Sequence, residues 1–536
     1  MRTPALIAIL AGACFVGGPA EAQTLRIALA SEPTAADPHY HDFMPNNALA
    51  QHIFDALVQR NEDQTLKPGL ASSWENDGKN RWTFKLRQGV AFSNGKPFTA
   101  EDVIFTFCRT LKNETKVSDA FGQFTGNFAS VEAPDPHTVV VNTSNPEPLL
   151  PNLLSRLGIL SASIVEHGPI SYDIAKNCGV TGAWPTVTGF NDGTLAIGTG
   201  PYKLKSYVRG SSIELERNPG YWGKAEPWAS VRFLPVFNGG PRLAGLLAGD
   251  YDVIENPAPR DLGRIKDDKR FGHVVTPSTR VIFFQLDVAR DQSPFVKSED
   301  GKNPLKDERV RKAMSLAIDR DAIVKRIMDD AAVPAYQFLP TGMFGTLPNP
   351  PKLAYDPAAA KKLMAEAGYA QGFQLTLSAT NNRYINDGQI TQAVAQYLAQ
   401  IGIKTEVDAM AHAIYFPRRA KKEFSVALAG PFSSGDTSDV LRNWAATQDV
   451  AKTFGGSNYG GYKNEQFDTL IRAAVTTMDD AKRAELLREA GKLVLADGAF
   501  IPLHFESSIW AYKSDLTVTG RADQFTLAMS VKPVAK

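Results

Sequence analysis

The 536-residue sequence lacks the short motifs that mark many enzymes. It has no G-x-S-x-G, H-E-x-x-H or C-x-x-C, and no G-x-x-x-x-G-K-[ST] phosphate loop. "GTGPYK" at 198–203 has two glycines but not the third of a dinucleotide-binding loop, and it predicts a turn. We therefore predict no catalytic residue and no cofactor. A secreted hydrolase that uses a pair of carboxylates stays open as an alternative, because such a pair leaves no local motif.

A bias of charge is also missing. Lys and Arg number 58 against 57 Asp and Glu, a formal net charge of +1. Removal of residues 1–22 takes away Arg2 and Glu21, which leaves 57 basic and 56 acidic residues and the same net charge. A balanced chain has no general electrostatic attraction to nucleic acid or to an anionic membrane. No later run of about 18 apolar residues follows, so we expect the mature protein to be soluble.

The first 22 residues have the composition of a secretory signal peptide. Arg2 supplies the positive charge, residues 5–16 the apolar core, and Ala20-Glu21-Ala22 the small-x-small cleavage site. The apolar stretch is too short to stay in a membrane as a permanent helix. Cys14 leaves lipidation open as the less favoured alternative. We therefore expect export to the periplasm.

Cysteine is scarce in this sequence. Cys108 and Cys178 are the two that follow the signal peptide. In an exported protein an isolated pair is more often a disulfide than a metal site or a nucleophile, so we predict a Cys108–Cys178 bridge. Two separately buried thiols are the alternative, because the sequence does not show whether the two Cα atoms come within reach of each other.

The residue pattern alternates strands with helices, which predicts α/β lobes. The 514 residues after the signal peptide exceed what one core usually supports, so at least two lobes are expected, and no repeat or long linker separates them. Strands are expected at 24–30, 81–87, 137–142, 212–217, 231–236, 403–410 and 424–430, and helices at about 99–110, 307–328 and 388–401, with two more in 464–496.

Two histidines stand close together in "DPHYH" at 37–41. His39 and His41 could share a metal ion if this segment were extended. No third ligand is obvious nearby, so a surface turn is the preferred interpretation and no metal site is predicted.

The loop "GPFSSGDTSDVLRNW" at 430–444 follows an expected buried strand and holds Asp436 and Asp439. A carboxylate at the carboxyl end of a strand, in a crevice, suits the ammonium group of a ligand. The alternative role is capping of the helix that follows. Capping is favoured for Asp439, whereas the two roles are evenly balanced for Asp436.

Four blocks, in order, resemble the signature of the peptide/nickel-type solute-binding proteins (family 5) of ABC importers. The first, at 67–107, contains "GLASSWENDGKNRWTFKLRQGVAFSNGKPFTAEDV". The others are "GTGPYKL…ERNPGYWG" at 198–223, "LLAGDYDVI" at 246–254 and "DERVRKAMSLAIDRDAIV" at 307–324. The resemblance runs from about Thr24 to the C-terminus.

This resemblance implies a fold of two α/β lobes joined at a hinge, with an extra subdomain in the first lobe. The implied parts are a signal peptide at 1–22, lobe I with its subdomain at 23–278, lobe II at 279–498 and a C-terminal return to lobe I at 499–536. The chain would cross between lobes near Thr279 and Ala499, and the lobes would close on ligand by hinge bending. Residues 84–105, a strand, a turn and a capped helix, then belong to the framework of the first lobe.

The family's residues carry over unevenly. Asp436 matches the Asp that pairs with a peptide's ammonium group in relatives, but Pro431-Phe432 replaces the Gly-Trp usual before that loop. Dipeptide receptors have an Arg where this chain has Asp387-Gly388, and Arg383 is the nearest Arg. His41 lies in a segment that lines the cleft of relatives. The ligand-binding candidates are therefore Asp436, Phe432, Ser434, Arg383, His41 and Asp439.

The resemblance implies a periplasmic receptor that hands a peptide-like solute to a membrane permease powered by an ATPase. A monomer suits such a hinge-closing receptor. Other ligands stay open: an opine, a modified sugar, a metal chelate or free nickel, the last being the weakest because the chain has no His cluster. A periplasmic sensor built on the same fold is a further alternative. A receptor needs no nucleophile and no general acid, which accounts for the missing enzyme motifs.

Overall fold

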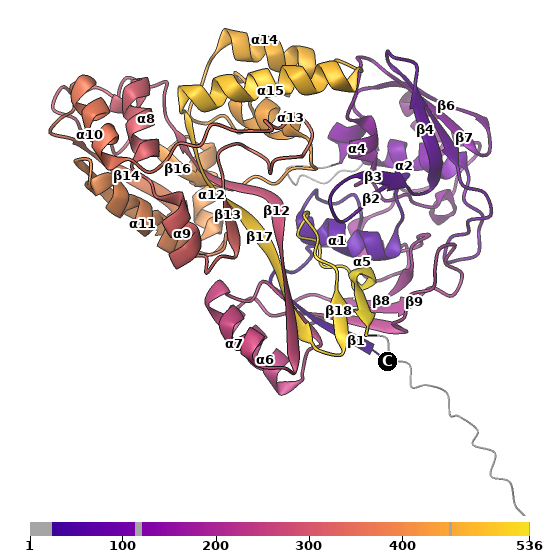
Figure 1. The fold of residues 1–536 in the computed structure, drawn as a ribbon. Helices are drawn as coiled ribbons and strands as arrows, with labels where there is room; N and C mark the ends of the chain where they lie inside the picture. The colour runs from indigo at the N-terminus through magenta and orange to yellow at the C-terminus, as the bar shows by residue number, and fades with distance from the viewer. Residues whose placement is uncertain (1–23, 113–120, 450–452, 535–536) are drawn as a thin grey trace, which may run out of the picture.

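The computed structural model describes residues 24–112, 121–449 and 453–534 (Figure 1). The predicted signal peptide, with Cys14, lies outside these residues. One mixed sheet extends through both lobes of the molecule, and β13 (Ala332–Pro334) pairs with it beside the main path. In spatial order the strands are β15 (Ile403–Met410), β14 (Phe373–Thr380), β16 (Val426–Ala429), β12 (Phe271–Leu286), β17 (Phe500–Lys513), β11 (Val253–Glu255), β1 (Thr24–Leu29), β10 (Ser230–Pro235), β9 (Ser212–Arg217) and β8 (Tyr202–Val208).

Two long antiparallel strands, β12 and β17, connect the lobes (Figure 1). They have 16 and 14 residues, against about five or six in an ordinary strand. They pair from Phe271↔Lys513 to Gln285↔Phe500, with register shifts after Pro277 and at Ile282/Phe283. The chain passes from the first lobe to the second in β12 and returns in β17, so the lobes share a two-stranded connection and no flexible linker.

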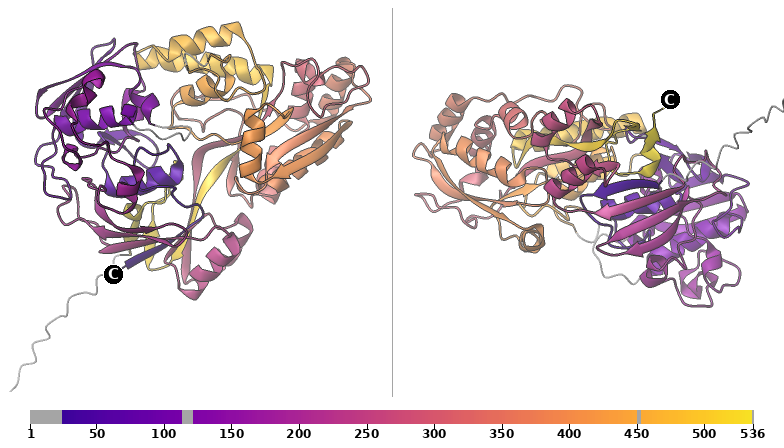
Figure 2. Two further views of the ribbon diagram at one scale, coloured as in Figure 1. Left: turned by 180° about the vertical axis from the view of Figure 1, so that it is seen from behind. Right: turned by 90° about the horizontal axis from the view of Figure 1, so that it is seen from below.

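The first lobe has helices on both faces of its part of the sheet (Figure 2). Leu243, Leu246 and Ile265 of α6 and α7 pack with Ala28 and Ile254 of the sheet. The opposite face carries α1 and merges with the largest core. The remaining elements of this half are α1 (Met44–Ile53), β2 (Val58–Arg60), β3 (Leu66–Pro68), α3 (Gly122–Thr125), α4 (Leu150–Leu154), α5 (Val187–Asn191), α6 (Gly239–Ala248) and α7 (Leu262–Asp267).

A second, four-stranded antiparallel sheet forms a subdomain on the first lobe. Its strands lie in the order β4 (Ala71–Asn76), β5 (Arg81–Leu86), β7 (Thr138–Thr143), β6 (Phe128–Asp135), packed with α2 (Ala100–Lys112). The Thr99 amide donates to the Asp102 carboxylate at 2.8 Å, so the expected capping box begins α2. The predicted disulfide is present: Cys108 of α2 is bonded to Cys178, with Cα atoms 6.4 Å apart.

The second lobe places helices on both faces of β14, β15 and β16. One core packs α8 (Glu308–Leu316), α9 (Arg320–Arg326), α10 (Pro357–Glu366) and α11 (Asp387–Ala399), and the other packs α13 (Thr437–Val440), α14 (Glu465–Ala474) and α15 (Asp480–Asp497). The helix expected at 307–328 is wrong as one element. Asp319 caps α9 by accepting from the Ala322 amide at 2.8 Å, so the chain turns there and forms two helices.

After β17 the chain runs back along the first lobe. Leu516, Ala528 and Val531 all belong to the large first-lobe core, as does Trp510 near the end of β17. The last strands, β18 (Leu516–Val518) and β19 (Val531–Pro533), pair with each other. In the second lobe, α12 (His412–Ala420) follows β15 and contacts β14. Within 24–112, 121–449 and 453–534, no helix has the length and apolar character needed to span a membrane.

Candidate ligand-binding site between the lobes

The register of the crossing strands shows which edge of the second lobe faces the first. β12 is antiparallel to β16, pairing Phe283 with Ala429 and Leu286 with Val426. Because β12 enters from the first lobe, it meets the carboxyl end of β16 first. β14 is parallel to both β16 and β15. The carboxyl ends of these three strands therefore point toward the first lobe.

The same argument orients the first lobe. β17 arrives from the second lobe and is antiparallel to β11, pairing Trp510 with Glu255 and Tyr512 with Val253. It therefore meets the carboxyl end of β11 first, and β1 and β10 run parallel to β11. The carboxyl edges of both lobes consequently face each other across the crossing strands. Ligands of open α/β sheets bind outside the carboxyl ends of the strands, so this junction is the candidate site.

A buried ion pair on the crossing strands forms the centre of the junction. Arg280 of β12 lies 3.4 Å from the Glu506 carboxylate of β17. The Arg280 guanidinium also donates to the Gln524 side chain (2.8 Å) and to the Gly430 carbonyl (2.5 Å). Burial, together with the positive charge of Arg383, lowers the pKa of Arg280 to about 10. The pair thus joins both strands, the loop after β16 and the C-terminal segment.

Arg383 is the positively charged residue of this site that can bind a ligand. Among the described residues, no acceptor lies within hydrogen-bond distance of its half-buried guanidinium, which sits 5.3 Å from the Tyr384 ring centroid. Tyr384 and Phe432 also flank Arg280, at 5.9 and 5.8 Å. Asp387 accepts from the Arg383 and Tyr384 amides at 3.1 Å each and so fixes this segment at the carboxyl end of β14. The structure thus brings Arg383 and Phe432 to the same cationic and aromatic surface.

Asp436 caps α13 and is paired within the second lobe. Its carboxylate accepts from the Ser438 amide (2.9 Å) and from Arg483 Nη1 of α15 (2.6 Å). The residue is 2 % exposed, and burial raises the pKa of Asp436 although the charge of Arg483 opposes the shift. The sequence left helix capping and ligand binding evenly balanced for Asp436. The structure shows that Asp436 caps α13 and that its negative charge is already paired with Arg483.

Ser434 and Asp439 are joined to each other, since the Ser434 hydroxyl donates to the Asp439 carboxylate at 2.6 Å. Ser434 lies in the loop after β16, whereas Asp439 lies in the first turn of α13. The capping role favoured for Asp439 is therefore wrong, since Asp436 is the residue that caps this helix. His41 lies elsewhere, before α1 in the first lobe, where its half-exposed ring stacks on Phe43 with centroids 5.3 Å apart. Within the described residues, His41 has no hydrogen bond to any of the other five candidates.

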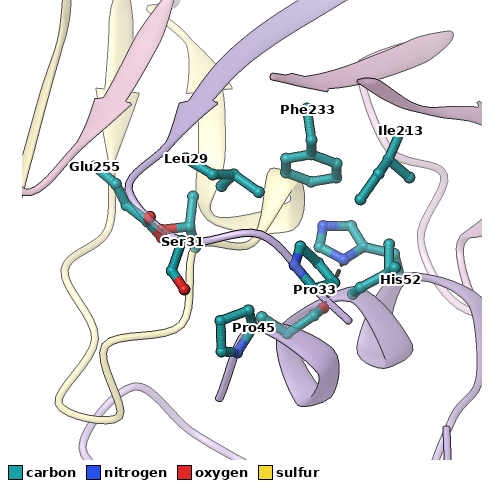
Figure 3. Close-up of a pocket in the computed structure, with 11 residues that line it drawn as sticks. Leu29, Ser31, Pro33, Pro45, His52, Ile213, Phe233 and Glu255 are labelled. Carbon is teal, nitrogen blue, oxygen red and sulfur yellow. Dashed lines mark hydrogen bonds between the residues drawn. The ribbon is translucent and has the colours of Figure 1, made fainter. Parts of the chain in front are cut away.

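A small apolar pocket lies in the first lobe beside this junction (Figure 3). Figure 3 shows Glu255 and Ser31 at one end of the pocket and Ile213 and His52 at the other. Glu255 ends β11 and accepts from the Thr526 hydroxyl at 2.6 Å. Every lining residue belongs to the first lobe or to the C-terminal segment on it, so the pocket is walled by one lobe alone.

No group of three or more His, Cys, Asp or Glu side chains in the described part of the chain is placed to hold a metal ion. Sequence reasoning missed the central residues Arg280, Glu506 and Gln524. One signal was available: Glu506 is the single acid in "FIPLHFESSIW", whose other residues are apolar or small apart from His504. A buried charge in such a run needs a partner, but the sequence alone does not identify Arg280 as that partner.

The lobes, the two crossing strands and the facing carboxyl edges define a two-lobed solute-binding protein. The model of the bacterial extracellular solute-binding proteins, family 5, matches residues 65–452, and the chain belongs to this family. Members of this family serve transport as binding proteins and are not enzymes.

Curated relatives are similar over nearly the whole chain. The periplasmic oligopeptide-binding protein OppA of Salmonella typhimurium is 26% identical over 515 residues, covering 91% of this chain and 88% of the relative. The dipeptide-binding protein of Escherichia coli is 28% identical over 509 residues, covering 91% and 90%. Among solved structures, the periplasmic binding protein DppA of Helicobacter pylori, in complex with the peptide STSA, has a TM-score of 0.75 at 23% identity, covering 95% and 98%.

Proposed function

We propose that this chain is the solute-binding component of an ABC importer, which captures a peptide-like solute between its lobes and delivers it to a membrane permease driven by an ATPase. The observation that carries this proposal is the strand register, because it turns the carboxyl edges of both lobes toward one junction. Two lobes connected through β12 and β17 can bend at those strands and close on a ligand.

A peptide-like ligand is supported by the chemistry of the junction. Arg383 offers a guanidinium that the described protein leaves without an acceptor, which suits a ligand carboxylate. The rings of Tyr384 and Phe432 provide apolar contact beside it. The relatives OppA and the dipeptide-binding protein are named for binding oligopeptides and dipeptides. An acid group beside an apolar side chain is what these residues would recognise.

The remaining candidates have weaker roles in this proposal. Asp436 would receive a ligand ammonium group only by sharing a carboxylate that Arg483 already holds, so its contribution should be smaller than that of Arg383. Ser434 and Asp439 would line the loop, and His41 would contribute from the first lobe when the lobes close.

The proposed divisions follow the crossing strands: lobe I at 23–278, lobe II at 279–498 and the return to lobe I at 499–536. The relatives that carry the word periplasmic in their names support a periplasmic location for this chain. Hinge closure requires one copy of the chain, so we propose a monomer, and the balanced charge favours no nucleic acid partner.

Native mass spectrometry of the mature protein, purified from the periplasm without refolding, tests the proposal. We expect a discrete added mass that is lost on denaturation and fragments as a peptide. A mass that fragments as an opine, a modified sugar or a metal chelate would keep the receptor and overturn the ligand class. Absence of any added mass, with a flat thermal-shift screen of these ligands, would contradict the receptor, since a ligand at a hundredfold excess over Kd raises stability by about 2.7 kcal/mol.

A further inference from the structure

One contact between the lobes does not involve the crossing strands. Arg60, the last residue of β2 in the first lobe, donates from Nη1 to the Ser434 carbonyl of the second lobe at 2.5 Å. Its other main partners belong to the first lobe. Nε donates to the Ser155 hydroxyl (2.7 Å), and Nη2 donates to the backbone carbonyl (3.0 Å) and side-chain oxygen (2.9 Å) of Asn152. Three bonds thus fix the guanidinium in the first lobe and direct one N–H group at the second.

The backbone around Ser434 lies against the first lobe. Gly435 has φ +87°, and a Cβ atom placed on it would come within 3.1 Å of the Gln64 Cβ atom, which belongs to the turn after β2. On its other side the Gly435 carbonyl accepts from the Phe344 amide at 3.1 Å, a contact inside the second lobe. The loop is therefore carried by the second lobe and touches the first lobe through its backbone, where a glycine is required.

Charges on the two lobes are complementary at this contact. Burial lowers the pKa of Arg60 to about 10, whereas Asp439 and Asp436 of the second lobe act to raise it. On the same lobe as Arg60, burial raises the pKa of Glu147. The positive charge of Arg442 from the second lobe opposes that shift more strongly than the negative charge of Asp439 adds to it. A cation of lobe I therefore faces acids of lobe II, and an acid of lobe I faces a cation of lobe II.

We propose that Arg60 is a latch for lobe closure, a positioning residue that holds the loop at 430–436 over the ligand by its bond to the Ser434 carbonyl. The inference rests on the proposed function, because a latch requires lobes that open. When the lobes separate, Nη1 loses its short bond to the Ser434 carbonyl, while its longer contact with the Gln64 carbonyl (3.4 Å) and the bonds to Ser155 and Asn152 persist. The guanidinium stays oriented in the open form, so the bond re-forms on closure with little loss of side-chain freedom.

Distances between spin labels on the two lobes of the full mature protein test this latch. Lys79→Cys in the first lobe and Lys361→Cys in the second are exposed positions, and the native cysteines are already bonded to each other. Arg60→Gln removes the charge, and Arg60→Lys keeps the charge without the forked geometry. Arg109→Lys is the matched control, because Arg109 is a buried arginine that pairs with Asp37 inside the first lobe.

We expect the closed-to-open ratio without ligand to fall about tenfold in Arg60→Gln and by a smaller factor in Arg60→Lys, in keeping with loss of a charge-assisted hydrogen bond. Arg109→Lys should keep the wild-type distribution even though it lowers the unfolding temperature. Wild-type distributions in both Arg60 variants would overturn the latch, and so would equal opening in the Arg109 control. If Arg60→Gln does not fold, the comparison of Arg60→Lys with the control decides the question.

An equimolar mixture of dipeptides to pentapeptides, added to the same labelled proteins, separates this inference from the proposed function. If the peptide mixture shifts the wild-type protein to the closed form and dissociates about tenfold faster from Arg60→Gln, both the peptide-binding proposal and the latch are supported. A mixture that closes no variant counts against the peptide-binding proposal, whereas the latch is still decided by the ligand-free distributions. Closure and dissociation at wild-type rates in both Arg60 variants overturn the latch and leave the receptor intact.

Discussion

Two buried histidines form a natural comparison, because one is fully hydrogen-bonded and the other is not. Both side chains are 0% exposed. His52 of α1 bonds the Ala48 carbonyl through Nδ1 (2.8 Å) and accepts from the Ala528 amide at Nε2 (2.9 Å). His504 of β17 has no partner for either ring nitrogen among the described residues. Burial lowers the pKa of His52 to about 4 and that of His504 to about 3.

Replacement by leucine should therefore have opposite effects at the two positions. At pH 7, His504→Leu removes unpaired polar atoms whose burial costs about 1–3 kcal/mol, while a change of similar volume loses less than about 1.5 kcal/mol of packing. We expect a net stabilisation of about 1 kcal/mol. His52→Leu removes two hydrogen bonds and leaves the Ala528 amide unpaired, so we expect a destabilisation of about 2 kcal/mol.

The two substitutions share one effect, which is the loss of acid sensitivity. In the folded protein both histidines stay neutral well below pH 6.5, whereas in the unfolded chain they take up a proton there. The unfolded state then binds more protons, so stability falls as the pH falls. Between pH 7 and pH 5 each histidine removes about 2 kcal/mol, at 1.36 kcal/mol per pH unit below 6.5. At pH 5, His504→Leu should therefore exceed the wild type by about 3 kcal/mol.

Urea unfolding of the mature protein at pH 7 and pH 5, followed by tryptophan fluorescence, measures these differences. Equal m-values in wild type and variants are the condition for comparing the midpoints. A His504→Leu variant that is less stable than the wild type at both pH values would refute the reasoning, because it would mean that the ring nitrogens have partners. A stability difference that does not change with pH would refute the assignment of a neutral buried ring.

Three further outcomes follow from the structure. Reduction of Cys108–Cys178, which spans 70 residues, should lower the free energy of unfolding by about 4 kcal/mol, and a count of two free thiols in the unfolded, non-reduced protein would contradict the bridge. Arg383→Ala should weaken binding of a solute with a free carboxylate by more than about 1.5 kcal/mol and leave the melting temperature unchanged. If the same solute with its carboxylate converted to an amide loses as much affinity, Arg383 does not recognise the carboxylate. Asp436→Ala should destabilise the fold by about 3 kcal/mol, because the buried Arg483 loses its buried carboxylate partner and keeps the exposed Asp480. Urea unfolding of the double variant Asp436→Ala/Arg483→Met should show most of that loss recovered.

Local features of the fold could be predicted from the sequence because they depend on residues that are close together along the chain. The alternation of Trp82, Phe84 and Leu86 predicts β5, and Thr99 with Asp102 predicts the start of α2. The second use of Asp102 could not be predicted. Its other oxygen accepts from the Ala162 amide at 2.8 Å, sixty positions away, which only the folded chain brings close.

In the candidate site, too, the local features could be predicted from the sequence and the long-range contacts could not. The loop at 430–436 was recognisable from its composition and its place after a buried strand. Whether Asp436 caps a helix or serves a ligand could not be settled from the sequence, because its partner Arg483 lies 47 residues further along the chain. Arg280 and Glu506 meet on strands more than 200 residues apart, so their pairing depends on the sheet register and on nothing local.

Hydrogen exchange measured with and without bound solute tests the central claim most directly. The protein as purified with its solute is compared with the same protein stripped by denaturation and refolding. We predict slower exchange in the ligand-loaded form at 380–386 and 430–436 of the second lobe and, in the same sample, at 30–32 and 254–257 of the first. Protection confined to one lobe, or protection away from the carboxyl ends of the strands, would contradict a solute held between the two facing edges.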